Sequence, residues 1–137
     1  MIKGRAAEAE SAGDVAASVG QKLILETSNV SSVITNALTI WSRKAHIQML
    51  QETLVTPGAA GRYKQEAKAH GKTLEVGVLD PEQNKVAAGV GLVTAQGLRP
   101  YKLPNPTKDF QDAEATGRVA MYCIDLAGTT LTIAVIY

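Results

Sequence analysis

The sequence holds little of several features that mark specialised classes of protein. It has one cysteine, Cys123, so no disulfide can form within the chain. Aromatic residues make up 4% of the chain, and no apolar run reaches the roughly 18 residues of a membrane span. Lys3 and Arg5 are not followed by the apolar segment of a secretory signal. These absences predict an intracellular protein, of the cytoplasm or the nucleus, with no membrane partner.

Neither sign of charge is in excess. The chain carries 14 Lys and Arg against 13 Asp and Glu, for a formal net charge of +1. This balance excludes a strongly basic nucleic-acid-binding surface spread over the whole molecule, but it leaves room for a local basic patch. The composition is 45% hydrophobic and 20% charged over 137 residues, which is typical of one globular domain or of part of one.

The first half of the chain alternates strand and helix patterns. Residues 1–20 are rich in Ala, Glu, Ser and Gly, and we expect a loose N-terminal extension there. Apolar spacing then predicts a strand over 21–28, an amphipathic helix over 32–44 and a strand over 45–51. Ser31 or Ser32 is a suitable N-cap for the helix. Strand, helix and strand in so short a span indicate a βαβ unit with two parallel strands.

Two polar residues follow directly after these two strands. Asn29 comes after the first strand, and Glu52 comes after the buried run that contains Ile47, Met49 and Leu50. Because parallel strands end at the same edge of a sheet, an amide and a carboxylate are expected to converge there. Such a pair is suited to holding a hard divalent cation and orienting a phosphate beside it. The alternative is that Glu52 is simply a solvated residue at a strand end.

The pattern of the remaining sequence predicts one more helix and two hairpins. A glycine-rich run, Gly89-Val90-Gly91, indicates close backbone packing rather than a phosphate-binding loop, because no helix follows it. Cys123 lies inside an apolar strand pattern, which favours a packing role over a nucleophilic one. The predicted elements are a helix over 59–70, a hairpin of 73–79 and 87–94 around a turn at 80–84, an extended segment and loop over 99–112, and a hairpin of 116–124 and 129–137.

Taken in order, several short blocks resemble the N-terminal half of the endonuclease/exonuclease/phosphatase family, which has the deoxyribonuclease-I-like fold. The most specific block is Ile47-Gln48-Met49-Leu50-Gln51-Glu52-Thr53. The other blocks are not specific alone, and they support the resemblance through their order and spacing. The match runs from about residue 23 to residue 137. They are Ser28-Asn29-Val30, Gly89-Val90-Gly91-Leu92-Val93, Gly117-Arg118-Val119 and Ile133-Ala134-Val135-Ile136-Tyr137.

The resemblance implies an α/β fold that is part of a four-layer α/β sandwich, with residues 21–137 forming the N-terminal half of the domain. Members of the family cleave phosphate esters with Mg²⁺ or Mn²⁺. The family's metal-binding Glu falls on Glu52, its active-site Asn on Asn29, and the Tyr that helps to place the phosphate on Tyr137. The resemblance therefore implies a metal-dependent phosphodiesterase, most simply an endonuclease with nucleic acid as its partner, and it would suit a retrotransposon.

The sequence also departs from the family pattern. Many members have a second Asn where this chain has Ser31, and Asp where it has His46. The family's later Asp-x-Asn motif and terminal Asp-His pair would fall beyond residue 137. Those groups activate water and stabilise the reacting phosphate in the family mechanism. We therefore expect the chain alone to be inactive and to need the missing C-terminal half of the domain.

Other interpretations of the sequence remain open. The chain can be a non-catalytic fragment or a degenerate binding module of the same fold, which the missing catalytic groups favour. It can also be an unrelated α/β domain in which Gln51-Glu52-Thr53 occurs by chance. Within the family, lipid and inositol phosphatases stay possible, because the residues that separate these substrates lie largely in the absent half.

Overall fold

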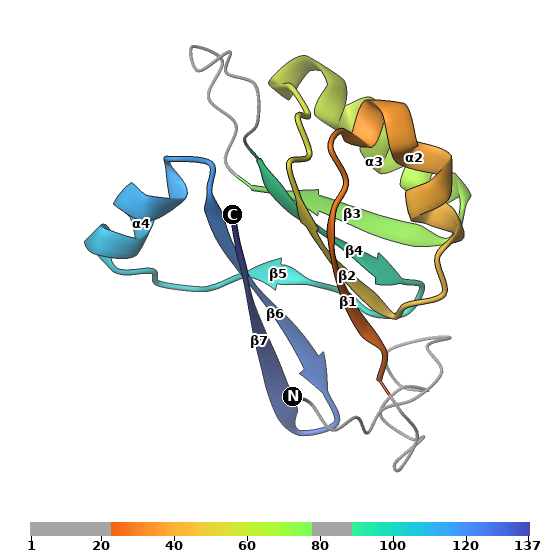
Figure 1. Cartoon of the computed structure of the whole chain (residues 1–137). Coiled ribbons are helices and arrows are strands. Elements are labelled where there is room, and N and C mark those ends of the chain that lie inside the picture. Colours follow the sequence, from red (N-terminus) through yellow and green to blue (C-terminus); the bar gives the residue numbers. More distant parts are fainter. Residues whose placement is uncertain (1–22, 78–88) are drawn as a thin grey trace.

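A computed structural model describes residues 23–77 and 89–137, and this part of the chain is a mixed α/β structure with three helices and two sheets (Figure 1). No helix in these two ranges is long and apolar enough to cross a membrane. The predicted extension over 1–20 and the predicted turn at 80–84 lie outside the described residues. The elements are β1 (Leu25–Asn29), α2 (Val33–Ser42), β2 (Ile47–Gln51), α3 (Pro57–Ala69), β3 (Lys72–Val76), β4 (Val90–Ala95), β5 (Tyr101–Lys102), α4 (Lys108–Glu114), β6 (Val119–Leu126) and β7 (Thr129–Ile136).

The first sheet has the strand order β1-β2-β4-β3. Strands β1 and β2 pair in parallel, as the βαβ spacing predicts, and the register sets Asn29 opposite Gln51. Strands β3 and β4 pair in antiparallel fashion, which confirms the first predicted hairpin. Because Asn29 ends β1 and Glu52 directly follows β2, the two residues emerge at the same edge of the sheet.

Helix α2 is tied to the end of β1 by its own side chains. Ser32 is the N-cap, and its hydroxyl accepts a hydrogen bond from the Thr35 N–H at 3.4 Å. Asn36 interrupts the helical backbone, with φ −116° and ψ 18°, and its side-chain amide donates to the Val30 carbonyl at 2.7 Å. This side-chain hydrogen bond holds the loop that follows Asn29 against the first turn of α2.

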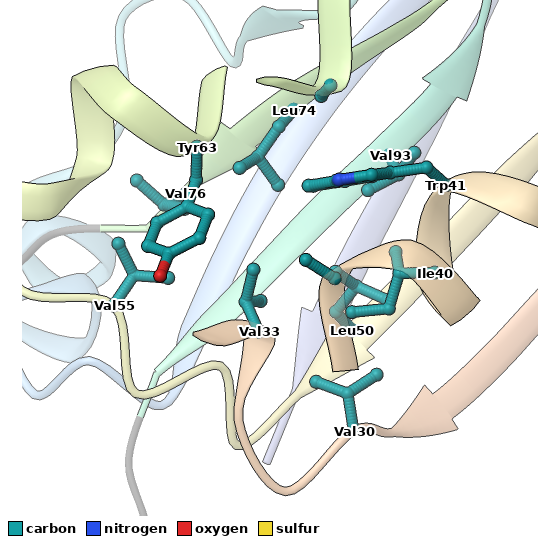
Figure 2. Close-up of a cluster of buried hydrophobic side chains, with 12 residues drawn as sticks. Val30, Val33, Ile40, Trp41, Leu50, Val55, Tyr63, Leu74, Val76 and Val93 are labelled. Carbon is teal, nitrogen blue, oxygen red and sulfur yellow. The ribbon is translucent and has the colours of Figure 1, made fainter. Parts of the chain in front are cut away.

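Helices α2 and α3 cover one face of the first sheet and form a helix-side core with it (Figure 2). Trp41 is 2% exposed in this core, and its indole N–H donates to Glu66 on α3 at 3.0 Å. The apolar 3.6-residue spacing of α2 is therefore buried against the sheet in part, because Ile34 and Leu38 of the same pattern are exposed. The buried members of the helix-side core are Val30, Val33, Ala37, Ile40, Trp41, Leu50, Val55, Tyr63, Ala67, Leu74, Val76 and Val93.

The second sheet, with strand order β5-β6-β7, packs against the other face of the first sheet. Strands β6 and β7 form the second predicted hairpin, and the structure confirms it. Buried residues of both sheets share one inter-sheet core: Leu23, Ile47, Val90, Leu92, Leu98, Ala120, Tyr122, Ile124, Ile133 and Val135. This packing carries the end of β7 toward the end of β2, although the two strands are far apart in the sequence.

The prediction of an extended segment and loop over 99–112 is correct up to residue 107, where the extended part includes the short strand β5, and wrong for residues 108–112, which belong to the helix α4. Thr107 is the N-cap of α4 and accepts a hydrogen bond from the Phe110 N–H at 3.1 Å, and Lys108 forms an ion pair with Asp112 at 2.7 Å. The prolines that suggested a loop all precede this cap, so they do not interrupt the helix.

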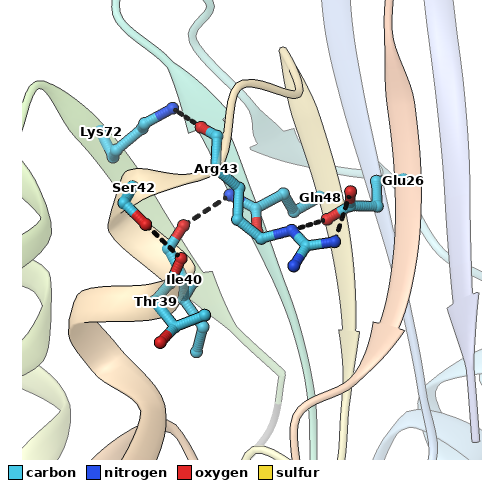
Figure 3. A network of polar contacts seen from close by, with 7 residues as sticks. All are labelled: Glu26, Thr39, Ile40, Ser42, Arg43, Gln48 and Lys72. Carbon is cyan, nitrogen blue, oxygen red and sulfur yellow. Dashed lines mark hydrogen bonds and ion pairs between the residues drawn. The ribbon is translucent and has the colours of Figure 1, made fainter.

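A network of polar contacts lies at the edge of the first sheet where β2 begins (Figure 3). Arg43 forms an ion pair with Glu26 on β1, at 2.5 Å from its Nε atom. The Lys72 ammonium donates to the Arg43 carbonyl at 2.9 Å, and the buried Gln48 amide donates to the Ile40 carbonyl at 3.0 Å. The bonds from Lys72 and Gln48 satisfy carbonyl groups at the C-terminal end of α2. Burial lowers the pKa of Lys72.

Candidate functional site

The backbone turns sharply where β2 ends. Glu52 has φ 57° and Leu54 has φ 51°, so two non-glycine residues occupy the left-handed region on either side of Thr53. Such a conformation costs roughly 1–3 kcal/mol per residue and persists only where the surroundings hold it. Here the Thr53 N–H donates to the Gly89 carbonyl at 3.3 Å, and the Thr53 carbonyl accepts from the Val33 N–H at 3.0 Å. The turn is thus fixed by β4 on one side and α2 on the other.

Three side chains meet beside this turn. The Tyr137 hydroxyl donates a hydrogen bond to the Glu52 carboxylate at 2.7 Å. Hydrogen bonding by the Asn29 side chain also lowers the pKa of that carboxylate. The Asn29 carbonyl oxygen accepts from the Ser31 N–H at 3.0 Å, which leaves the amide group to face Glu52. The structure therefore brings together Asn29, Glu52 and Tyr137, which we call the strand-end cluster.

Hydrogen bonding fixes the protonation states in the strand-end cluster. The bond from Asn29, followed by the bond from Tyr137, lowers the pKa of Glu52, and burial acts weakly in the opposite direction. The bond to Glu52 raises the pKa of Tyr137, together with burial and the carboxylate charge, while the Arg118 charge lowers it. At neutral pH the cluster therefore presents an ionised carboxylate that is oriented by two neutral donors.

Hydrogen bonds join the two sheets beside the strand-end cluster. The Gln51 side-chain amide donates to the Ile136 carbonyl at 2.7 Å, which ties the end of β2 to the end of β7. The Gly89 N–H donates to the Gly117 carbonyl at 3.2 Å, and the Tyr137 N–H donates to the Arg118 carbonyl at 2.8 Å. These bonds fix the relative positions of Glu52 and Tyr137.

Gly89 and Gly91 allow this close approach. A Cβ atom on Gly89, which has φ 108°, would lie 2.5 Å from the Thr53 hydroxyl oxygen. A Cβ atom on Gly91 would lie 2.9 Å from the Glu75 carbonyl oxygen. The close backbone packing predicted for this glycine pair is therefore confirmed.

The donor set of the strand-end cluster fits a hard cation only in part. Glu52 supplies carboxylate oxygens, which suit Mg²⁺ and Mn²⁺. Asn29 directs its amide toward Glu52, so it orients the carboxylate rather than adding an oxygen beside it. Within residues 23–77 and 89–137, no group of three or more His, Cys, Asp or Glu could hold a metal ion. A cation at Glu52 would keep most of its coordination shell as water.

Other residues singled out in the sequence lie elsewhere or act indirectly. His46 is at the opposite end of β2, where its Nδ1 accepts a hydrogen bond from the Ile24 N–H at 2.9 Å. Cys123 is a buried free thiol in β6. Sequence reasoning missed the contact of Gln51 with β7 and the position of Arg118, whose guanidinium carbon lies 5.4 Å from the centre of the Tyr137 ring.

The comparisons with known proteins give a structural likeness alone. No protein-family model matches the sequence, and no curated protein matches it. Among solved structures, the chain is similar to the endonuclease domain of TRAS1, a telomere-specific non-LTR retrotransposon, with 15% sequence identity and a TM-score of 0.49. The likeness covers 81% of this chain and 43% of that domain, so the chain spans less than half of the domain's length.

Proposed function

We propose that the chain belongs to a divalent-metal-dependent phosphodiesterase, namely an endonuclease that uses Mg²⁺ or Mn²⁺ and acts on nucleic acid. The observation that supports this most directly is the strand-end cluster. It joins the three residues to which the sequence resemblance gives roles in a phosphodiesterase, and it does so at the carboxyl ends of two parallel strands. The deoxyribonuclease-I-like four-layer sandwich is part of the same proposal.

Each member of the cluster has a role in this proposal. Glu52 holds the cation, because its lowered pKa keeps it ionised at neutral pH. Asn29 orients the carboxylate, and Tyr137 places its hydroxyl beside the phosphate. When bound, the cation polarises the scissile phosphate and offsets the charge that develops on its oxygens.

The proposal also needs a general base, and the described residues do not offer one at this place. His46 lies at the other end of β2, and His70 follows the last turn of α3. A base must lie within hydrogen-bond reach of the attacking water. We therefore expect fast turnover only when the Asp-x-Asn motif and the Asp-His pair implied by the resemblance are also supplied.

The lack of a general base at this place among the described residues also supports a second candidate function. A chain with a partial metal site and no base is also what a non-catalytic nucleic-acid-binding module of this fold would show. The two functions differ in what Glu52 does. An enzyme needs Glu52 to be ionised for catalysis, whereas a binding module tolerates its replacement.

The test is Mg²⁺-dependent cleavage of supercoiled plasmid and of an abasic-site duplex. The 137-residue chain is compared with a longer chain that carries the two later motifs, each with Glu52→Gln and with Asp125→Asn as the matched control. The amide that Glu52→Gln introduces can still accept the bond from Tyr137, and Asp125 is an exposed carboxylate at the hairpin end of β6.

We expect negligible cleavage by the short chain, cleavage by the longer chain, and its loss in Glu52→Gln but not in Asp125→Asn. Binding without cleavage in every chain would favour the non-catalytic module. Robust cleavage by the short chain that disappears in Glu52→Gln would support the enzyme, but would show that the later motifs are not needed.

A further inference from the structure

Helix α2 carries two large apolar side chains that the described part of the chain does not bury. Ile34 is 51% exposed and Leu38 is 68% exposed, and the two lie one helical turn apart. Helix α2 also contains no charged residue. The outer face of a surface helix usually carries charged or polar side chains. A contiguous apolar strip in that position is typical of a surface that another molecule covers.

These two side chains line a groove between α2 and α3, which lie next to each other on the first sheet (Figure 1). The groove has a volume of about 420 Å³. Its α2 wall includes Ile34, Leu38 and the interrupted helical backbone at Asn36, and its α3 wall includes Arg62 and Glu66. We call this feature the α2–α3 groove. One of its walls is therefore uncharged, and the other carries charge.

The two charges of the α3 wall have opposite signs, and each is held by a neighbouring aromatic side chain. The guanidinium carbon of Arg62 lies 4.8 Å from the centre of the Tyr63 ring, and the guanidinium donates to the Tyr63 hydroxyl at 2.8 Å. Glu66 accepts a hydrogen bond from the Trp41 indole N–H at 3.0 Å. Neither Arg62 nor Glu66 forms an ion pair with another residue that the structure describes. Both charges are therefore available to an ion pair from outside the chain.

The groove is complementary to a second copy of itself. In a two-fold symmetric dimer, a residue that contacts a second residue of the partner is contacted in return by its own counterpart. Arg62 and Glu66 lie one turn apart on α3, so two antiparallel copies of this helix can set each Arg62 against Glu66 of the partner subunit. A partner of one charge sign would instead oppose one of these residues with a like charge.

We propose that the α2–α3 groove is the interface of a homodimer. Ile34 and Leu38 pack against the same uncharged wall of the partner subunit, and Arg62 pairs with Glu66 of the partner subunit. Because α2 has no charge, the two α2 walls meet without repulsion. The proposal goes beyond the proposed function and does not depend on it.

The experiment is sedimentation velocity of the 137-residue chain in EDTA, so that metal binding at the strand-end cluster plays no part. Total concentrations from about 5 to about 500 µM cover the range of a weak dimer. We expect a shift from the mass of one chain to the mass of two. Leu38→Glu should raise the dissociation constant of the dimer roughly tenfold or more, because it sets a carboxylate against apolar side chains. Leu38 is exposed within one chain, so the variant should keep the wild-type circular dichroism spectrum.

The matched control for Leu38→Glu is Ala134→Glu, which adds the same carboxylate to an exposed position of β7. Strand β7 is at the edge of the second sheet as the structure describes it, and it carries no charge. An uncharged edge strand is another surface through which two copies can associate. We expect Ala134→Glu to dimerise like the wild type. Loss of the dimer in Ala134→Glu but not in Leu38→Glu would place the interface at β7 and overturn the proposal.

Arg62→Glu and Glu66→Arg test the ion pairs across the interface. Each variant alone sets like charges against each other, so each should dissociate roughly tenfold more readily than the wild type. An equimolar mixture of the two should dimerise, because every carboxylate of one variant then faces a guanidinium of the other. Lys64→Glu is the control, since Lys64 is an exposed cation of α3 that does not line the groove. It should dimerise like the wild type.

Recovery in the mixture separates the interface from the fold. Glu66→Arg also loses the bond to Trp41, but mixing cannot restore a chain that has failed to fold. A wild-type chain that stays monomeric at the highest concentration would overturn the homodimer and leave the groove to a different occupant. A mixture that dimerises no better than its separate components, or an unchanged dimer in Leu38→Glu, would overturn it as well.

Discussion

The two ends of the β1–β2 pair use polar residues for different purposes. Where β2 begins, Arg43 is paired with Glu26, and Lys72 and Gln48 donate to carbonyl groups at the end of α2. Where β2 ends, the neutral donors Asn29 and Tyr137 orient the charge of Glu52. The bonds from Lys72 and Gln48 satisfy backbone carbonyl groups, whereas Glu52 is an ionised group that has no salt-bridge partner among the residues that the structure describes.

The backbone differs between the two ends as well. Glu52 and Leu54 hold positive φ values at the carboxyl end, and contacts to β4 and α2 support that strain. Strain of this kind is found at sites where a side chain must be held in one position. We therefore expect substitutions at the beginning of β2 to change stability alone, whereas substitutions at its end should change ligand binding as well as stability.

The largest effect on stability is expected at Gly89. Replacement by Ala adds left-handed strain at φ 108° and places a Cβ atom 2.5 Å from the Thr53 hydroxyl oxygen. Together these should lower the free energy of unfolding by about 2–4 kcal/mol. Urea denaturation followed by fluorescence of the single Trp measures the change.

Gly128→Ala is the control for Gly89→Ala. Gly128 has φ 81°, but a Cβ atom there would meet nothing within 4 Å, so only strain of about 1–2 kcal/mol is expected. Equal losses in the two variants would show that the turn after β2 is not tightly packed.

A smaller effect is expected from Trp41→Phe in the helix-side core. The change removes the hydrogen bond to Glu66 and leaves a small cavity at a side chain that is 2% exposed. We expect a loss of about 1–2 kcal/mol in the free energy of unfolding, measured by circular dichroism. Oligonucleotide affinity of the folded variant should not change. A large drop in that affinity would show that ligand binding at the end of β2 depends on the helix-side core.

The smallest effect is expected from Tyr137→Phe, and it is a change in pH dependence. Because hydrogen bonds lower the pKa of Glu52 in the folded protein, its ionisation contributes stability above the ordinary carboxyl pKa. That contribution is lost as the pH falls through the lowered value. Removing the Tyr137 hydroxyl should move the pKa of Glu52 upward while the Asn29 bond remains. Carboxyl carbon NMR of Glu52 measures the change, and an unchanged titration would show that the Tyr137 bond is not formed in solution.

The sequence predicts the parts of this structure that depend on local pattern. The βαβ unit, both hairpins and the shared edge of Asn29 and Glu52 follow from apolar spacing and from the geometry of parallel strands. Helix α4 was missed because three prolines resemble a loop signal, although all of them precede its N-cap Thr107. Residue propensities alone do not predict that α4 begins after Thr107.

The contacts between the sheets could not be predicted from spacing. The bond between Tyr137 and Glu52 depends on how the second sheet packs on the first, and its expected role came only from the family resemblance. The place of Arg118 depends on the β6–β7 register and on the turn at Gly117, neither of which a single sequence fixes.

The most direct test of the central claim is to locate a bound divalent cation by Mn²⁺ titration of the ¹⁵N-labelled chain. Paramagnetic broadening should appear first at the amides of Asn29, Glu52 and Tyr137, the three residues of the strand-end cluster. It should be lost in Glu52→Gln and kept in Asp125→Asn. Broadening centred on another carboxylate, or an unchanged pattern in Glu52→Gln, would contradict the claim that the strand-end cluster is the metal site of a phosphodiesterase.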